Sequence, residues 1–126
     1  MNQNKFFYCR HCGNLVEMIH SAGVPMVCCG DKMDPLPLND PKASAEKHLP
    51  VASLKDGILH VKIGMVPHPM ETEHYIRWVY VHTKTRSFRR DLLPGQPPET
   101  EVWVGDDRPL AVYAYCNIHG LWLTTL

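Results

Sequence analysis

Short stretches in which apolar and polar residues alternate dominate the chain after residue 50 and predict β-strands. In residues 58–65 every second residue is apolar, so these side chains would share one face of a strand. The stretch 74–82 has a similar pattern, and shorter candidates follow at residues 87–92, 101–104, 110–115 and 121–123. Turns rich in Gly, Pro and Asp separate them, and this spacing favours an antiparallel sandwich or barrel.

The first 36 residues show a different pattern and predict a small separate unit. Asn14–Ile19 is extended and apolar-rich, and Val24–Val27 is a candidate short strand. So few apolar residues cannot bury a self-sufficient core, so the unit needs a metal or an oligomeric partner. The prolines of Met33–Pro41 predict a semi-rigid linker, and Ala43–Lys47 has room for one helical turn.

Composition narrows the function classes. The chain has 126 residues, with 13 basic and 13 acidic side chains. Because the net charge is near zero, nothing predicts nucleic-acid binding or attraction to an anionic membrane. The first seven residues lack the apolar core of a signal peptide, and no apolar run approaches the length of a membrane span. We therefore expect a cytoplasmic protein, in which clustered cysteines favour metal or redox chemistry over disulfides.

The distribution of the five cysteines predicts two different sites. Four of them fall in the first 29 residues: Cys9, Cys12, Cys28 and Cys29. Four soft thiolates suit Zn or Fe, and the adjacent last pair predicts a distorted tetrahedron. A structural zinc knuckle and a disulfide pair are the alternatives. His11, inside the first pair, is expected to be exposed rather than a fifth ligand.

Cys116 and His119 form a second, incomplete ligand set just before Gly120. His48, His68 and His74 are the candidate partners, because prolines or a strand start hold their backbones. Four imidazoles and one thiolate are too many for structural zinc and differ from the blue-copper set. They suit iron with one octahedral position open. The remaining histidines are expected to be solvated: His11, His20, His60 and His82.

Several separated motifs resemble one known family. Cys9–Gly13 with Cys28–Gly30 resembles a desulforedoxin-type domain. The later motifs resemble desulfoferrodoxin, the two-iron superoxide reductase family, in this order: Glu46–Pro50, His68–Met70, Glu73–Ile76 and Cys116–Gly120. The resemblance covers essentially the whole chain.

This resemblance implies a mainly β protein with two domains and two irons. Residues 1–36 would be a desulforedoxin-like iron–tetrathiolate domain, and 37–126, with a linker at 37–41, an immunoglobulin-like antiparallel β-sandwich that carries the catalytic iron. Cys116 would be the axial ligand, and four histidines would be equatorial: His48, His68, His74 and His119. The family also implies a homodimer and a rubredoxin-like electron donor. We expect the apolar tail 122–126 to pack at the dimer interface.

The implied activity is superoxide reduction, in which superoxide, one electron and two protons give hydrogen peroxide. Lys47 would attract the anion and place a proton-donating water, and Glu46 would occupy the sixth iron position in the oxidised state. The competing hypothesis is a non-catalytic metalloprotein, either a two-iron electron carrier or a zinc-stabilised binding module.

Overall fold

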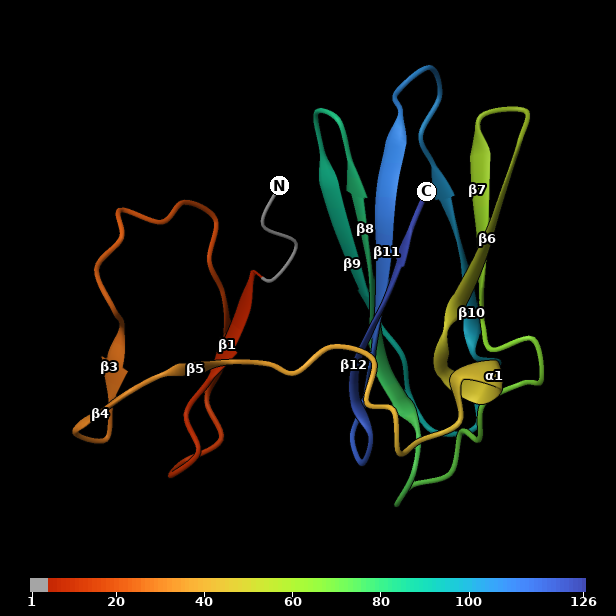
Figure 1. Cartoon of the computed structure of the whole chain (residues 1–126). Helices are drawn as coiled ribbons and strands as arrows, with labels where there is room; N and C mark the ends of the chain where they lie inside the picture. The colour runs from red at the N-terminus through yellow and green to blue at the C-terminus, as the bar shows by residue number, and fades with distance from the viewer. Residues whose placement is uncertain (1–4) are drawn as a thin grey trace. The chain divides into compact units, whose positions relative to one another are not determined.

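The computed structural model describes residues 5–126, and the chain forms two compact units divided between Pro37 and Leu38 (Figure 1). Nearly all regular structure is β, and the described residues contain one short helix, α1 (Ala45–His48). The prediction of a mainly β protein with a cysteine knuckle is therefore confirmed. Within residues 5–126, no helix is long and apolar enough to cross a membrane.

The amino-terminal unit consists of very short strands around a small core. One sheet has the order β2-β1-β5 and contains β1 (Phe6–Tyr8), β2 (Leu15–Glu17) and β5 (Asp34–Pro35). A separate hairpin pairs β3 (Val27–Cys28) with β4 (Asp31–Lys32). The buried hydrophobic side chains among the described residues of this unit are Phe6, Cys9, Met33 and Leu36. Such a small core is consistent with a unit that needs further cross-linking.

The carboxy-terminal unit is a sandwich of two antiparallel sheets (Figure 1). One sheet has the order β10-β7-β6 and is built from β6 (Pro50–Lys55), β7 (Ile58–Ile63) and β10 (Glu99–Trp103). The other has the order β12-β11-β8-β9 and is built from β8 (Ile76–Thr83), β9 (Ser87–Asp91), β11 (Pro109–Cys116) and β12 (Gly120–Thr125). Side chains of β7, β8 and β11 form the core between the sheets.

Strand β8 departs from the expected alternation because both of its faces are covered. Val79 and Val81 belong to the core between the sheets. On the other face Trp78 stacks on Tyr115 of β11 and Tyr80 meets Tyr113 edge to face, with ring centroids 5.3 and 5.7 Å apart. Such cross-strand aromatic pairs bury positions that a one-sided strand would expose.

Several strand boundaries differ from the sequence prediction, mostly at prolines and glycines. The linker prediction is wrong at its beginning, because Asp34–Pro35 is an edge strand, a place where proline costs no ladder hydrogen bond. Strand β6, which no specific prediction covered, likewise starts at Pro50 on an edge. The Val24–Val27 prediction is wrong except at Val27, where β3 begins.

The apolar tail 122–126 belongs to β12 as far as Thr125 rather than forming a free segment. Trp122 and Leu123 are 1% and 7% exposed, so these two side chains are covered within the chain itself, whereas Leu126 is 45% exposed. The expected contact of the tail with a second copy stays a prediction. Asn39 also docks on β12, since its side-chain oxygen accepts a hydrogen bond from the Leu123 amide at 2.8 Å. The tail therefore completes the sandwich.

Three segments meet at one end of the sandwich: α1, the loop that follows β7, and the β11–β12 hairpin (Figure 1). The loop is tied to α1 by backbone hydrogen bonds from the amides of Gly64 to Leu49 and of Met65 to Glu46, at 3.1 and 2.8 Å. β7 ends at Ile63, earlier than predicted, because Gly64 takes a left-handed conformation at φ +86°.

Candidate metal centres

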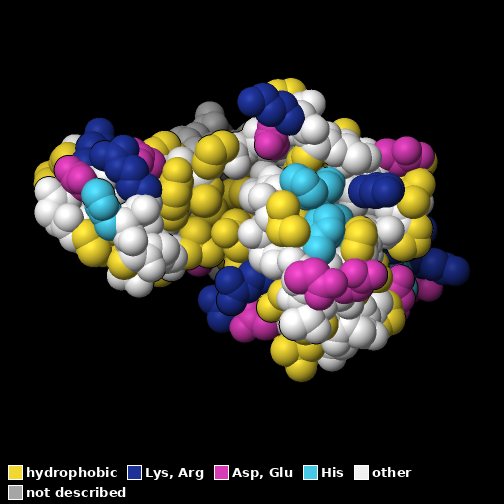
Figure 2. Space-filling view, turned by 90° about the horizontal axis from the view of Figure 1, so that it is seen from below, with side chains coloured by type: hydrophobic (Ala, Val, Ile, Leu, Met, Phe, Trp, Pro, Cys, Tyr) yellow, Lys and Arg dark blue, Asp and Glu magenta, His cyan; other side chains and the backbone are white. Residues whose placement is uncertain are grey.

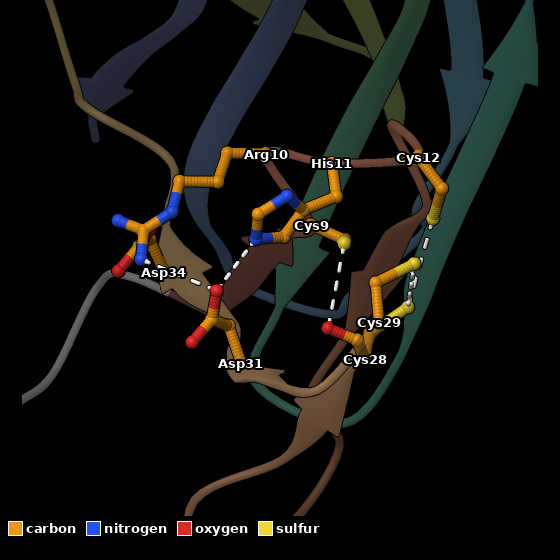
Figure 3. A network of polar contacts seen from close by, with 8 residues as sticks. All are labelled: Cys9, Arg10, His11, Cys12, Cys28, Cys29, Asp31 and Asp34. Carbon is orange, nitrogen blue, oxygen red and sulfur yellow. Dashed lines mark hydrogen bonds and ion pairs between the residues drawn. The ribbon is translucent and has the colours of Figure 1, made fainter.

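The four amino-terminal cysteines converge, as Figure 3 shows, with one pair facing the other. Their sulfur atoms all lie within 4.8 Å of one another. Cys12 Sγ is 3.6 Å from Cys28 Sγ, and Cys28 Sγ is 4.0 Å from Cys29 Sγ. A tetrahedral ion with metal–sulfur bonds of about 2.3 Å would place its sulfurs about 3.8 Å apart. All five cysteines of the chain are free, which contradicts the disulfide alternative.

A hairpin turn explains how adjacent cysteines can both face one ion. Cys28 pairs with Asp31, so Cys29 and Gly30 form the two-residue loop between β3 and β4. Their φ values are +53° and +78°, as in a type I′ turn. Consecutive side chains of a straight strand point to opposite faces, whereas this turn breaks the alternation. Cys28 and Cys29 can therefore be adjacent in sequence and still face one ion, because they lie at the tip of a hairpin.

The acid–base properties of these thiols differ strongly. A hydrogen bond from the Cys12 amide lowers the pKa of Cys9 to about 6. Hydrogen bonds with the Cys12 and Cys9 side chains raise the pKa of Cys29 to about 12. Without a cation the cluster would thus keep part of its protons, because four thiolates repel one another. A bound metal ion would supply the positive charge that holds all four as thiolates.

Polar side chains join the two halves of this cluster from outside (Figure 3). His11 Nε2 lies 2.6 Å from Asp31 Oδ2, and Arg10 lies 3.5 Å from Asp34 and 3.9 Å from Asp31. His11 is exposed and its ring pairs with the Asp31 carboxylate, so it does not lie among the sulfur atoms as a fifth ligand. The loop with the first cysteine pair is thereby held against the hairpin with the second.

In the carboxy-terminal unit four imidazole rings form a closed square. The neighbouring rings His48–His68, His68–His74, His74–His119 and His119–His48 have centroids 4.6, 4.7, 5.1 and 4.8 Å apart and lie nearly perpendicular to one another. The centroids of His48 and His74 are 6.5 Å apart, as expected for opposite corners. One ligand atom from each of His48, His68, His74 and Cys116 lies within 4.8 Å of the others.

Hydrogen bonds on the outer side of the square select which nitrogen faces inward. His48 Nδ1–H donates to the Ser44 carbonyl at 2.6 Å, and His68 Nδ1–H donates to the Pro69 carbonyl at 2.7 Å. Both residues therefore turn Nε2 toward the centre. His119 instead presents Nδ1, which lies 3.1 Å from His48 Nε2. Such outer hydrogen bonds fix the tautomer of metal-binding histidines.

Two observations test whether a metal fits this square. His74 Nε2 is buried and has no hydrogen-bond partner among residues 5–126, which leaves a lone pair that a cation would satisfy. His48 Nε2 is 3.1 Å from both His68 Nε2 and His119 Nδ1. Metal–nitrogen bonds of about 2.1 Å would place neighbouring nitrogens of a square about 3.0 Å apart. The donor set and its spacing fit a metal ion.

Burial favours the neutral form of His48 and His68, which is the form that binds metals. Desolvation lowers the pKa of His68 to about 4, and it also lowers the pKa of His48. Both residues are only 3% exposed. These histidines therefore do not need to lose a proton at neutral pH before they bind a metal.

Cys116 lies beside the square, with its Sγ 3.9 Å from His119 Nδ1, and it is fully buried at 0% exposure. Burial raises the pKa of its thiol, although the amides of His119 and Ile118 act in the opposite direction. The His119 amide donates to Cys116 Sγ at 3.4 Å. Burial favours the protonated thiol, although nearby amides favour the thiolate. A cation bound beside the sulfur would complete the shift to the thiolate.

Asn117, to which the sequence analysis gave no role, brackets His74. Its side-chain oxygen accepts a hydrogen bond from the Tyr75 amide at 2.9 Å, and its side-chain amide donates to the Glu73 carbonyl at 3.0 Å. It thereby ties both neighbours of His74 to the hairpin that carries Cys116 and His119. The sequence offered one signal for this role, since Asn117 lies between the candidate ligands Cys116 and His119.

Glu46 and Lys47 are exposed residues of α1, next to His48. His74 and His119 are half-buried. Figure 2 shows histidine side chains at the surface of this end of the sandwich, with cationic and acidic side chains around them. His60, expected to be solvated, lies 3.1 Å from Glu101 on the β7–β10 ladder, away from the square.

Comparisons with known proteins agree with the two-site arrangement. Residues 1–36 match the family described as desulfoferrodoxin, N-terminal domain, and residues 40–125 match the family described as desulfoferrodoxin. A desulfoferrodoxin homolog of Archaeoglobus fulgidus is 41% identical over 116 residues, which cover 92% of each chain. The desulfoferrodoxin of Nitratidesulfovibrio vulgaris is 38% identical and covers 96% of this chain and 95% of its own.

Solved structures show the same similarity. The superoxide reductase of Treponema pallidum superposes with a TM-score of 0.78 at 33% identity and covers 96% of this chain and 98% of its own. A superoxide reductase of Giardia intestinalis, described as 1Fe-SOR, gives a TM-score of 0.54 at 28% identity and covers 64% of this chain and 97% of its own. The similarity to the first structure thus extends over both units.

Proposed function

This chain belongs to the desulfoferrodoxin family, and we propose on that premise that its histidine–cysteine square is the active centre of a superoxide reductase. The enzyme reduces superoxide to hydrogen peroxide and detoxifies it with electrons from an external donor. The single observation that supports this most is the square of four imidazoles beside a buried thiol. It offers five donors, so an octahedral ion held there would have one further position for a small ligand.

The assigned ligands of the second iron are His48, His68, His74, His119 and Cys116, and those of the first iron are Cys9, Cys12, Cys28 and Cys29. Iron held by these residues would supply the one electron that superoxide needs. The thiolate of Cys116 would donate electron density to that iron, and ligand identity is a main control of iron chemistry. The net reaction consumes one superoxide, one electron and two protons for each hydrogen peroxide.

The two exposed residues before His48 are assigned roles at the open side. The ammonium group of Lys47 attracts the superoxide anion and holds a proton-donating water near it. The carboxylate of Glu46 would be a ligand of the oxidised iron and would leave it on reduction. The support for both roles is their position in α1, directly before a ligand, and their exposure.

Replacing Lys47 with Ala is expected to lower the second-order rate constant with superoxide about three- to tenfold at low ionic strength, since one attracting charge at the entrance is lost. The difference should shrink as salt is added, because the Debye length falls to about 8 Å at physiological ionic strength. Stopped-flow mixing of reduced protein with superoxide over a series of salt concentrations measures both effects.

Lys55→Ala is the matched control for this experiment. Lys55 lies at the β6–β7 hairpin, at the end of the strands opposite α1 (Figure 1), and its replacement changes the net charge equally. If Lys55→Ala and Lys47→Ala slow the reaction to the same extent, the effect is one of overall charge, and the assigned role of Lys47 is wrong.

The product balance tests the function itself. Each superoxide consumed by the reduced protein should yield one hydrogen peroxide and no dioxygen. A dismutase would instead release one peroxide and one dioxygen for every two superoxide ions. Rapid mixing followed by measurement of both products separates the two reactions, and release of dioxygen would contradict the proposal.

Two measurements separate the enzyme from the non-catalytic alternatives. Metal analysis should find two irons per chain, whereas zinc alone would point to a binding module. Cyanide should shift the thiolate absorption band of the oxidised protein, because five protein donors would leave one exchangeable position on the iron. An unchanged band would indicate a closed, outer-sphere electron carrier.

We assign residues 1–36 to the iron–tetrathiolate domain and residues 37–126, with the linker 37–41, to the catalytic sandwich. A rubredoxin-like protein is the proposed electron donor. Exposed apolar side chains on the small unit support a homodimer, since Ile19, Val24 and Val27 are 90%, 71% and 67% exposed. Five free cysteines support a reducing, cytoplasmic location.

A further inference from the structure

Trp122 of β12 contacts two neighbouring corners of the histidine square. Its indole ring stacks on His48, with centroids 4.7 Å apart and an angle of 19° between the planes. Its Nε1–H donates a hydrogen bond to the His119 carbonyl at 3.2 Å. The side chain is 1% exposed, so both contacts are shielded from water.

The two histidines that Trp122 contacts come from distant parts of the chain. His48 ends α1 and His119 lies in the β11–β12 hairpin, yet their ring nitrogens must stay 3.1 Å apart. Rotation of the His48 ring would move Nε2 away from the centre, and stacking on a fixed indole opposes this rotation. The hydrogen bond to the His119 carbonyl in turn fixes the backbone whose amide donates to Cys116 Sγ.

We propose that Trp122 is a positioning residue that sets the metal affinity and geometry of the square through His48 and His119. This inference rests on the proposed function of the centre, but it concerns a residue that is not itself a ligand. A buried indole N–H needs an acceptor, and any core carbonyl would satisfy that need. Here the acceptor belongs to one ligand residue while the ring face covers another, which core packing alone does not require.

The test is ferrous-iron affinity of the full-length chain, measured anaerobically by competition with a chelator. Trp122→Phe keeps an aromatic face and removes the N–H, and it should weaken iron binding at the square about 3- to 10-fold. Trp122→Leu removes both contacts and should weaken it about 10- to 100-fold, the range found for outer residues of metal sites. The electron paramagnetic resonance spectrum of the oxidised centre should change in both variants.

Two controls separate positioning from a loss of packing. Trp78→Phe truncates another buried tryptophan, which stacks on Tyr115 rather than on a histidine of the square. The four-cysteine centre of the same chain is an internal reference that should keep its iron affinity. If Trp122→Phe binds iron at the square as tightly as Trp78→Phe does and leaves the spectrum unchanged, Trp122 only fills the core and the inference is overturned.

This outcome is independent of the proposed enzyme activity, because no turnover is measured. If the Trp122 variants bind iron normally and the protein reduces superoxide without releasing dioxygen, the positioning role alone is refuted. A protein that loses iron as expected but releases dioxygen from superoxide would refute the proposed function alone.

Discussion

Replacement of Cys116 by Ser is expected to lower the rate constant of the reduced protein with superoxide at least about 100-fold, which exceeds the usual effect of an outer residue at a metal site. The hydroxyl group is a much poorer anionic donor than a thiol, so the electron density that the thiolate would give the iron is lost. Because Ser is similar in size and can accept the His119 amide hydrogen bond, the sandwich should still fold. Stopped-flow kinetics and the disappearance of the thiolate absorption band measure the loss.

Cys12→Ser is the matched control, because it makes the same chemical change in the other centre. Its thiol lies among the four clustered cysteines of the amino-terminal unit. A protein reduced beforehand should then react with superoxide at the original rate, while iron at the four-cysteine centre is lost. A loss of the superoxide reaction in Cys12→Ser would instead make the first centre an obligatory electron relay. Retention of the reaction in Cys116→Ser would exclude the proposed role of its thiolate.

Gly64→Ala is expected to destabilise the carboxy-terminal unit by about 3 kcal/mol, from backbone strain combined with steric overlap. A Cβ at this position would lie 2.5 Å from the Lys47 carbonyl oxygen and closer still to that of Val66. These are backbone atoms that hold α1 against the loop leading to His68, so they cannot move without displacing two corners of the square. The melting temperature should fall by roughly 10–20 °C.

Gly95→Ala isolates the steric part of this effect. Gly95 has φ +87°, close to the +86° of Gly64, but a Cβ there would meet no atom within 4 Å. It should cost only about 1 kcal/mol, the contribution of the left-handed backbone. Tryptophan fluorescence follows unfolding of this unit alone, because all three tryptophans lie in it. Equal melting temperatures for the two variants would show that the loop yields and that no tight contact exists.

The ligand types of both centres were predictable because they depend on the chemistry of single residues. The pair Cys9 and Cys12 and the pair Cys28 and Cys29 supply soft donors whatever the fold, and the structure brings their sulfurs together. The reason for the adjacent second pair was not predictable from donor chemistry, since it lies in the positive φ values of the hairpin tip. The geometry of this turn, rather than the number of cysteines, directs the Cys29 side chain toward the other three sulfur atoms.

The burial pattern of a strand could be predicted from the sequence where one face of the strand is buried. The prediction failed where both faces are buried. β7 alternates between buried and more exposed positions, as its sequence does. β8 is covered on both sides, and its second face is buried by tyrosines of β11 that lie more than 30 positions later in the chain. Periodicity within a segment contains no information about such partners.

The sequence by itself determined the donors, their assignment to two centres and the mainly β architecture. These follow from side-chain chemistry and local periodicity, which single segments carry. Only the tertiary structure decided which nitrogen of each histidine faces inward, that Asn117 brackets His74, and that Trp122 covers His48 while bonding His119. These features depend on contacts between residues far apart in the chain, and such contacts exist only after the two sheets have packed.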